Sequence, residues 1–281
     1  MAGRFVTDHR VVRVRDGRIS KARDRLIVEE PLELRVAGRP VGVTMRTPGA
    51  DVELAIGYCI TEGLLTSHDQ IETVRACESK GESGEYNTLS VELRPGVPLP
   101  DPSLDRLHVT SSSCGVCGKS SIDAVRVRCA SVEGDPLVVD VATLAAIPDR
   151  VRDAQRLFEQ TGGLHAAALV EPDGRVVCVR EDVGRHNAVD KVIGWAAMNG
   201  LLPASGRILF VSGRCSFELA QKAAVAGIPL IAAVSAPSSL AVTLAGELGM
   251  TVVGFLRGPN MNLYTRADRV RVDEPAREAV S

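Results

Sequence analysis

The chain has 281 residues, of which 45% are apolar and 24% are charged, so it can bury a hydrophobic core and remain in solution. No apolar run reaches the ~18–20 residues of a membrane span, and residues 1–10 lack the apolar stretch of a secretory signal. A net charge of −2 with 3% aromatic residues does not indicate a nucleic-acid-binding surface. We therefore expect a cytoplasmic protein that binds neither a membrane nor nucleic acid.

The first part of the chain predicts a small β-rich domain with one helix. Residues 32–45 alternate apolar and polar side chains around a turn at 37–40, which is typical of a β-hairpin. Apolar residues at helical spacing predict a helix over 51–65, and renewed alternation predicts a strand over 88–93. We assign residues 1–105 to this domain.

A proline-rich stretch marks the domain boundary. Four prolines fall within residues 95–103, where neither a helix nor a central strand can continue. The residues that follow, 106–135, are predicted to form a connector. Within it, 110–118 is small, polar and rich in glycine, so we predict a mobile loop there.

The remainder, residues 136–275, alternates strands and helices. The predicted strands are 165–170, 176–180, 208–211, 230–234 and 252–256, and the predicted helices are 186–198, 216–226 and 238–248. Asp140 and Asp149 are predicted N-caps of two helical pieces that end near Gln160. The strand runs are continuously apolar, which indicates a sheet buried on both faces. The pattern predicts a three-layer α/β/α domain, and the whole chain therefore combines α+β and α/β architecture.

Two of the seven cysteines, Cys114 and Cys117, form a C-x-x-C motif in the predicted loop. The motif could supply half of a zinc site, but a second C-x-x-C or H-x3–5-H is missing from the sequence. A thioredoxin-like dithiol would follow an apolar strand, whereas this motif follows three serines. A buried pair fits a polar segment poorly. A persulfide carrier needs an accessible thiolate on a loop, and a cation such as Lys119 would lower its pKa. A second thiol could protect the sulfur, resolve the persulfide or accept the sulfur by exchange.

Three turns follow predicted strands of the second domain, at the edge where α/β sheets bind ligands. Ser212, Gly213 and Arg214 precede a helix and form a potential phosphate-binding turn. Residues 235–239 form a similar turn, and 254–260 end the last predicted strand. The three together favour a nucleotide-like anion site.

A further polar segment, Glu181 to His186, stands at another strand-to-helix turn. Its histidine is more often a structural hydrogen-bonding residue than a catalyst in such a setting. His165, at the start of an apolar strand, is expected to belong to the core.

At these residues the sequence resembles the FdhD/NarQ family of formate dehydrogenase accessory sulfurtransferases. The similarity extends over an ordered set of segments, supported by the helix at 51–63. These segments are 113–118, 163–168, 181–191, 212–214, 217–222, 233–236 and 253–255.

The resemblance implies a cytidine deaminase-like second domain, a homodimer and a defined reaction. It implies that Cys114 accepts persulfide sulfur from a cysteine desulfurase, with Cys117 as its partner thiol. The acceptor would be the molybdenum bis(molybdopterin guanine dinucleotide) cofactor of a formate dehydrogenase catalytic subunit. The resemblance places binding of this cofactor, through its guanine nucleotide part, at Phe255, Leu256, Arg257, Gly258, Pro259 and Asn260, which adds to the turn at Ser212, Gly213 and Arg214. We expect no tightly bound metal.

Two alternatives differ in chemistry. A zinc-dependent deaminase or hydrolase of the same fold would need H-x-E and P-C-x-x-C motifs, yet Ala166 and Ala167 follow His165 and a serine precedes Cys114. A non-catalytic molybdenum cofactor chaperone would bind the cofactor without sulfur chemistry, so it would tolerate loss of Cys114.

Overall fold

The computed structural model describes residues 5–77, 87–102, 106–110 and 129–272. It contains two compact units, each built from separate stretches of chain. Unit 1 comprises Met1–Arg128, Ala154–Ala167 and Val179–Leu201, and unit 2 comprises Cys129–Asp153, Ala168–Cys178 and Leu202–Ser281. The domain boundaries that the sequence analysis placed at residues 105 and 135 stay a prediction. Within the described ranges, no helix has the length and apolar character needed to cross a membrane.

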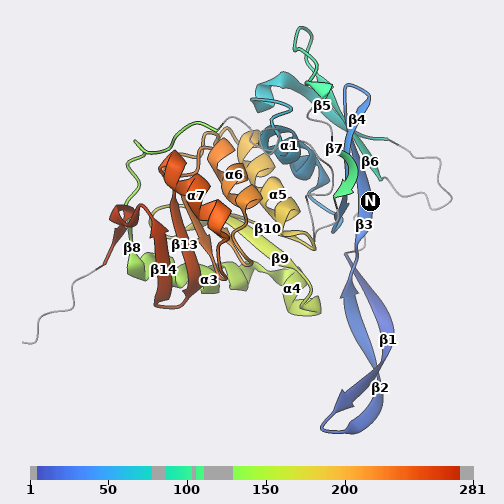
Figure 1. The fold of residues 1–281 in the computed structure, drawn as a ribbon. Coiled ribbons are helices and arrows are strands. Elements are labelled where there is room, and N and C mark those ends of the chain that lie inside the picture. Colours follow the sequence, from blue (N-terminus) through green and yellow to red (C-terminus); the bar gives the residue numbers. More distant parts are fainter. Residues whose placement is uncertain (1–4, 78–86, 103–105, 111–128, 273–281) are drawn as a thin grey trace, which may run out of the picture. The chain divides into compact units, whose positions relative to one another are not determined.

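Unit 1 begins with a two-stranded antiparallel ribbon that the sequence analysis did not predict (Figure 1). It consists of β1 (Val6–Arg15) and β2 (Arg18–Ile27). The two residues between them, Asp16 and Gly17, have φ values of 49° and 74°. Positive φ at both positions gives the tight hairpin turn that Asp-Gly favours, so this pair was the overlooked signal.

A five-stranded sheet in the order β5-β6-β3-β4-β7 follows the ribbon. Its strands are β3 (Glu30–Val36), β4 (Arg39–Arg46), β5 (Ile71–Cys77), β6 (Thr88–Leu93) and β7 (Arg106–Thr110). The predicted hairpin is confirmed by the antiparallel β3–β4 pair, with Ala37 and Gly38 in its turn at φ 48° and 79°. The strand predicted at 88–93 is also confirmed.

Helices α1 (Asp51–Thr61) and α5 (Arg185–Met198) cross in unit 1 at two glycines. A Cβ on Gly57 would lie 1.8 Å from the carbonyl oxygen of Asp190, and one on Gly194 would lie 1.8 Å from that of Glu53. Only glycine permits this approach. Two short helices, η1 (His68–Gln70) and α4 (Arg156–Thr161), also belong to this unit. The predicted helix at 51–65 is present but ends at Thr61.

The larger sheet has six strands in the order β10-β9-β11-β12-β13-β14. They are β9 (His165–Val170), β10 (Val176–Asp182), β11 (Ile208–Val211), β12 (Leu230–Ala233), β13 (Thr251–Arg257) and β14 (Asn260–Thr265). Strands β11, β12 and β13 are parallel, and β14 runs antiparallel to β13. Every residue of β11 and β12 is buried, and successive side chains point to opposite faces, so both faces are covered as predicted. A small parallel pair, β8 (Val139–Asp140) and β15 (Val270–Arg271), with η3 (Ala267–Arg269), lies outside this sheet.

The helices of unit 2 are α3 (Val141–Ala154), α6 (Phe217–Val225) and α7 (Ser239–Leu248). Asp149 as a second N-cap was wrong, because α3 continues through Pro148. Proline removes one backbone donor, but Leu144, Ile147 and Val151 form a buried stripe on both sides of it. Burial of that stripe offsets the lost hydrogen bond.

Candidate cofactor site at the strand ends of unit 2

The three predicted turns lie together at one edge of the sheet. Strand β11 leads into α6 and β12 leads into α7, whereas β13 leads into β14. Because β11, β12 and β13 are parallel, their carboxyl ends share one edge. The geometric prediction of a common edge is therefore confirmed.

Backbone hydrogen bonds hold the turns against one another. The amide of Ser235 donates to the carbonyl oxygen of Gly213 over 3.3 Å, and the amide of Phe255 donates to that of Ser235 over 3.2 Å. Cys215 receives a bond from the amide of Ser238 at 2.9 Å and donates to Ala236 at 3.2 Å. The loops thus form one connected surface.

The first turn leads into α6, and the side chain at the N-cap of this helix forms no capping hydrogen bond. Ser216 is the N-cap of α6, but its side chain makes no capping bond, and its buried Oγ has no hydrogen-bond partner among the described residues. By contrast Ser238, the N-cap of α7, accepts from the amide of Ala241 at 3.2 Å. Ser212 and Gly213 are half-buried and Arg214 is exposed. An anion here would meet the positive end of α6 and the guanidinium.

The segment 254–260 is a β-hairpin, which corrects the expectation that it ends the last strand. Strand β13 extends to Arg257, and β14 begins at Asn260. The strand pairing is irregular between Gly254 and Arg257, and Phe255 has a φ of 52° in this irregular part. At Gly254 a Cβ would lie 2.8 Å from Pro237, so the second turn packs directly on the hairpin.

Only some residues of the hairpin present side chains to solvent. Phe255, Arg257, Pro259 and Asn260 are exposed. Leu256 is fully buried, so its side chain belongs to the core and only its backbone is open to a ligand. Binding at Phe255 to Asn260 and at Ser212 to Arg214 stays a prediction.

Cys114 and Cys117 lie outside the described residues. Burial and pKa of the five described cysteines show which of those could act as nucleophiles. Cys59, Cys178 and Cys215 are buried, whereas Cys77 and Cys129 are partly exposed. Burial raises the pKa of Cys59 and of Cys215 to about 12, and also raises that of Cys129. These three thiols stay protonated at neutral pH and are poor nucleophiles.

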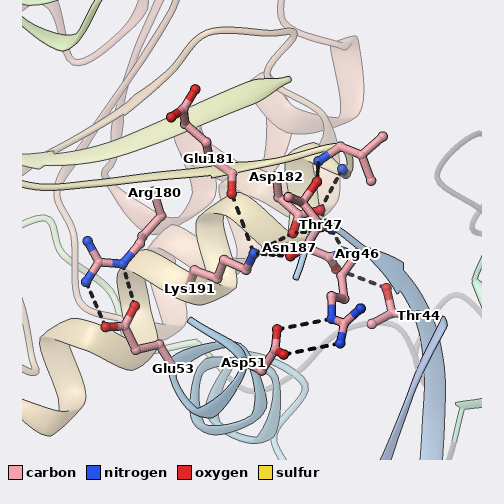
Figure 2. Close-up of polar contacts among 12 residues, drawn as sticks. Thr44, Arg46, Thr47, Asp51, Glu53, Arg180, Glu181, Asp182, Asn187 and Lys191 are labelled. Carbon is pink, nitrogen blue, oxygen red and sulfur yellow. Dashed lines mark hydrogen bonds and ion pairs between the residues drawn. The ribbon is translucent and has the colours of Figure 1, made fainter. Parts of the chain in front are cut away.

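The acidic motif of unit 1 forms a closed polar network (Figure 2). The Nζ atom of Lys191 lies 2.7 Å from Oδ2 of Asp182, and both side chains are buried, at 2% and 0% exposure. Asp182 also accepts from the amides of Thr47 (3.1 Å) and Gly184 (2.8 Å), and Lys191 donates to the carbonyl oxygen of Thr47 (2.9 Å). Asn187 bridges Asp182 to β4. Because its groups bond to one another, the network fixes the turn between β10 and α5.

Arginine–carboxylate pairs surround this network (Figure 2). Arg180 forms a two-point ion pair with Glu53, and Arg46 forms one with Asp51. Glu181 instead accepts from the backbone amides of Leu157 and Phe158 and so caps α4. The sequence showed the charged residues but gave no sign of these pairings. Arg180 and Glu53 are 127 residues apart, and the Arg46–Asp51 pair depends on how the chain turns between β4 and α1.

A cavity of about 230 Å³ in unit 1 lies beside this network. It is lined by Phe5, Pro48, Gly49, Ala50, Ala154, Leu157, Val179, Arg180, Glu181 and Lys191. Its charged groups are already bonded within the network, which leaves little to attract an ionic ligand. No group of three or more potential metal ligands occurs among the residues that the structure describes.

Comparison with known proteins assigns the chain to a family. Residues 27–271 match the model of the FdhD/NarQ family, so the chain is a member of that family. The resemblance noted from the sequence is thereby confirmed.

Individual relatives make the placement more specific. The chain is 53% identical over 272 residues to the sulfur carrier protein FdhD of Streptomyces coelicolor, covering 95% of this chain and 96% of the relative. It is 53% identical over 273 residues to the protein of the same name from Mycobacterium tuberculosis, covering 95% and 99%. The crystal structure of a candidate formate dehydrogenase accessory protein from Desulfotalea psychrophila has the same fold. Its TM-score is 0.75 and its identity 22%, over 95% of this chain and 100% of that one.

Proposed function

We propose that this protein is a sulfurtransferase that receives persulfide sulfur on Cys114 from a cysteine desulfurase. It then delivers the sulfur to the molybdenum bis(molybdopterin guanine dinucleotide) cofactor of a formate dehydrogenase. The observation that carries the proposal is the connected turn surface with Arg214, Arg257 and the unused Ser216. It occurs in a family whose relatives are named sulfur carriers.

The chemistry of the other cysteines supports Cys114 as the carrier. A carrier must be a thiolate that meets two protein surfaces, and Cys59 and Cys215 are buried with pKa values raised to about 12. The thiolate of Cys114 would attack the terminal sulfur of the donor persulfide, and the donor cysteine would leave as a thiolate. Cys117 would then attack the Sγ atom of Cys114 and release sulfide to the acceptor. The resulting disulfide requires a thiol reductant before the next cycle.

The turn surface suits the phosphates and base of the acceptor's guanine nucleotide. The N-terminus of α6 and Arg214 provide donors and positive charge for a phosphate group. Arg257 and Asn260 are exposed on the neighbouring hairpin and offer donors and an acceptor for a base edge. Phe255 provides an exposed aromatic face for stacking.

Two finer structural assignments belong to the same proposal. The order of the six-stranded sheet, with β9 and β10 before three parallel strands buried on both faces, supports a three-layer cytidine deaminase-like domain. A homodimer would bring two turn surfaces to the two guanine nucleotides of one cofactor.

The decisive experiment is intact mass spectrometry after incubation with a cysteine desulfurase and cysteine. We expect a gain of one sulfur atom that a thiol reductant removes and that is absent in Cys114→Ala. In Cys117→Ala we expect loading without release. Cys77→Ala is the matched control because Cys77 is also partly exposed, and it should load normally. Normal loading of Cys114→Ala would overturn the proposal.

Binding of GDP, measured by calorimetry, tests the turn surface separately. We expect Arg214→Ala and Arg257→Ala to weaken binding by about tenfold each, the magnitude of one charge-assisted contact. Arg271→Ala is the control, because Arg271 is an exposed arginine of the same unit that pairs with Asp140. Equal loss in all three variants would show that general charge, and not these turns, binds the nucleotide.

A further inference from the structure

The β1–β2 ribbon has no residue that is buried. All side chains of Val6–Arg15 and Arg18–Ile27 are exposed or half-exposed. Its contacts with the rest of unit 1 lie at its base, where Arg25 reaches Gln160 of α4. A two-stranded hairpin without a covered face is only marginally stable in water. Such a segment gains order when another surface covers it.

The strand register separates the ribbon into two different faces. Val14 lies opposite Ile19, Val12 opposite Lys21 and Arg10 opposite Arg23. Opposed residues share a face, and alternate residues along a strand do so too. Beyond the opposed pair Asp8 and Arg25, one face therefore combines three apolar side chains, 67%, 63% and 76% exposed at Val12, Val14 and Ile19, with three cations. We call this the apolar–basic face: Arg10, Val12, Val14, Ile19, Lys21 and Arg23.

The cations of this face are available to a partner. Residues 6–27 contain seven Lys or Arg and three Asp, an excess of four positive charges. Two of the carboxylates pair with other arginines, Asp24 with Arg13 at 3.7 Å and Asp8 with Arg25 at 4.0 Å. Arg10, Lys21 and Arg23 make no ion pair within the described part of the chain.

The ribbon also lies outside the segment that defines the family. The family model begins at Ile27, the last residue of β2. The similarity to the Streptomyces coelicolor relative covers 95% of the chain, which leaves too few residues outside it to exclude β2. At least β2 of the ribbon is therefore shared with such relatives, although all of it but Ile27 lies outside the segment that the family model matches. The function of the ribbon should be additional to the chemistry of that segment.

We propose that the apolar–basic face is a docking surface for a different protein that presents an apolar patch bordered by carboxylates. Apolar side chains at the centre of an interface supply burial, and cations at its rim select acidic partners. This inference does not depend on the proposed sulfur chemistry.

A second copy of this chain fits the face less well. Among the exposed large apolar residues of the described ranges, Val52 alone has a carboxylate on each side in the sequence. Both of these carboxylates are already paired, Asp51 with Arg46 and Glu53 with Arg180. A separate acidic protein therefore matches the charge pattern better.

Site-specific photo-crosslinking in the full chain tests the proposal in cells that make this protein. A benzophenone amino acid replaces Val14 on the apolar–basic face, or Ser20 on the opposite face as control. We expect one partner to be trapped from position 14 and not from position 20. No trapping from position 14, or equal trapping from both positions, would overturn the proposal. So would trapping of only a second copy, nucleic acid or lipid.

The trapped protein is then purified and titrated with the unmodified chain. We expect Lys21→Glu/Arg23→Glu to weaken binding by at least about tenfold, and added salt to weaken binding of the unmodified chain. Arg15→Glu/Arg18→Glu makes the same change in net charge on the opposite face and should alter binding by less than about threefold. Equal loss in both double variants, or no binding by the purified protein, would overturn the proposal.

Discussion

Two kinds of strand-to-helix turn in this protein use similar residues for different ends. The turn between β10 and α5 is held by Asp182, at the end of β10, and Lys191, in α5, which are buried and bonded to each other and to the backbone around Thr47. The turn between β11 and α6 leaves Arg214 exposed and the side-chain hydroxyl of Ser216 without a hydrogen bond. Both turns are polar and carry charge in the sequence.

The difference teaches that burial with satisfied partners separates a structural turn from the turn that we propose binds the ligand. A buried charge must be paired because desolvation is costly, so the first turn has little capacity left for a ligand. The second turn retains donors that only a ligand or solvent can use. The comparison predicts that mutations at the first turn lower the stability of the protein, whereas mutations at the second turn weaken ligand binding.

The largest expected effect is at the turn between β10 and α5, which we call the closed turn. Lys191→Met leaves Asp182 buried without its cation, which should lower the free energy of unfolding by about 3–5 kcal/mol. Denaturant unfolding followed by circular dichroism measures this loss. The double variant Asp182→Asn/Lys191→Met should be more stable than Lys191→Met alone, because no unpaired charge remains. A loss below about 1 kcal/mol in Lys191→Met would show that the pair is not essential for the turn.

The next effect concerns the helix that follows this turn. Gly57→Ala places a methyl group 1.8 Å from the carbonyl oxygen of Asp190 on α5, so the helices must separate. We expect a loss of about 1–3 kcal/mol in thermal or denaturant unfolding, as for other overpacked sites. Gly246→Ala in α7 is the control, because its nearest neighbour would be 3.8 Å away. That change should leave stability equal or raise it by up to about 1 kcal/mol.

A smaller effect depends on pH at Cys215. Burial raises the pKa of this thiol from 9.0 to about 12, so the unfolded chain loses the proton at a lower pH than the folded protein. The stabilisation is complete below pH 9.0 and is lost as pH rises toward 12. The difference in unfolding free energy between the natural chain and Cys215→Ala should therefore shrink over this interval. A constant difference would contradict the buried thiol.

The sequence predicted the parts of the fold that local patterns encode. The hairpin at residues 37–38, the strand at 88–93 and strands β9 to β13 of the larger sheet follow from alternation and continuous apolar runs, whereas β14 was not predicted. The β1–β2 ribbon was missed although Asp16-Gly17 is a strong turn signal. Its strands lack the regular alternation of apolar and polar residues that indicates one buried face. The N-cap predicted at Asp149 was wrong because burial of the apolar stripe of α3 outweighs the helix break expected at Pro148.

The candidate site was predictable in outline and not in detail. Parallel strands bring their ends to one edge, so three turns spread over residues 212–260 were expected together. The sequence could not show that Leu256 is buried, that Phe255 has a positive φ, or that Asp182 pairs with Lys191. These features arise from tertiary packing, which the local sequence pattern does not encode.

The smallest expected change in stability is at the turn between β11 and α6, which we call the open turn. Two N-cap serines, Ser216 of α6 and Ser238 of α7, provide a direct comparison. Ser238 caps α7 through the amide of Ala241, so Ser238→Ala should cost about 1 kcal/mol of unfolding free energy. Ser216 makes no capping bond to α6, and its Oγ is buried without a partner, so Ser216→Ala should change stability by less than about 0.5 kcal/mol. The same variant should weaken GDP binding measured by calorimetry, because the proposed site then lacks the hydroxyl that would contact the ligand. If Ser216→Ala destabilises the protein as much as Ser238→Ala and leaves GDP binding intact, Ser216 is an ordinary helix cap and the open turn is structural like the closed one.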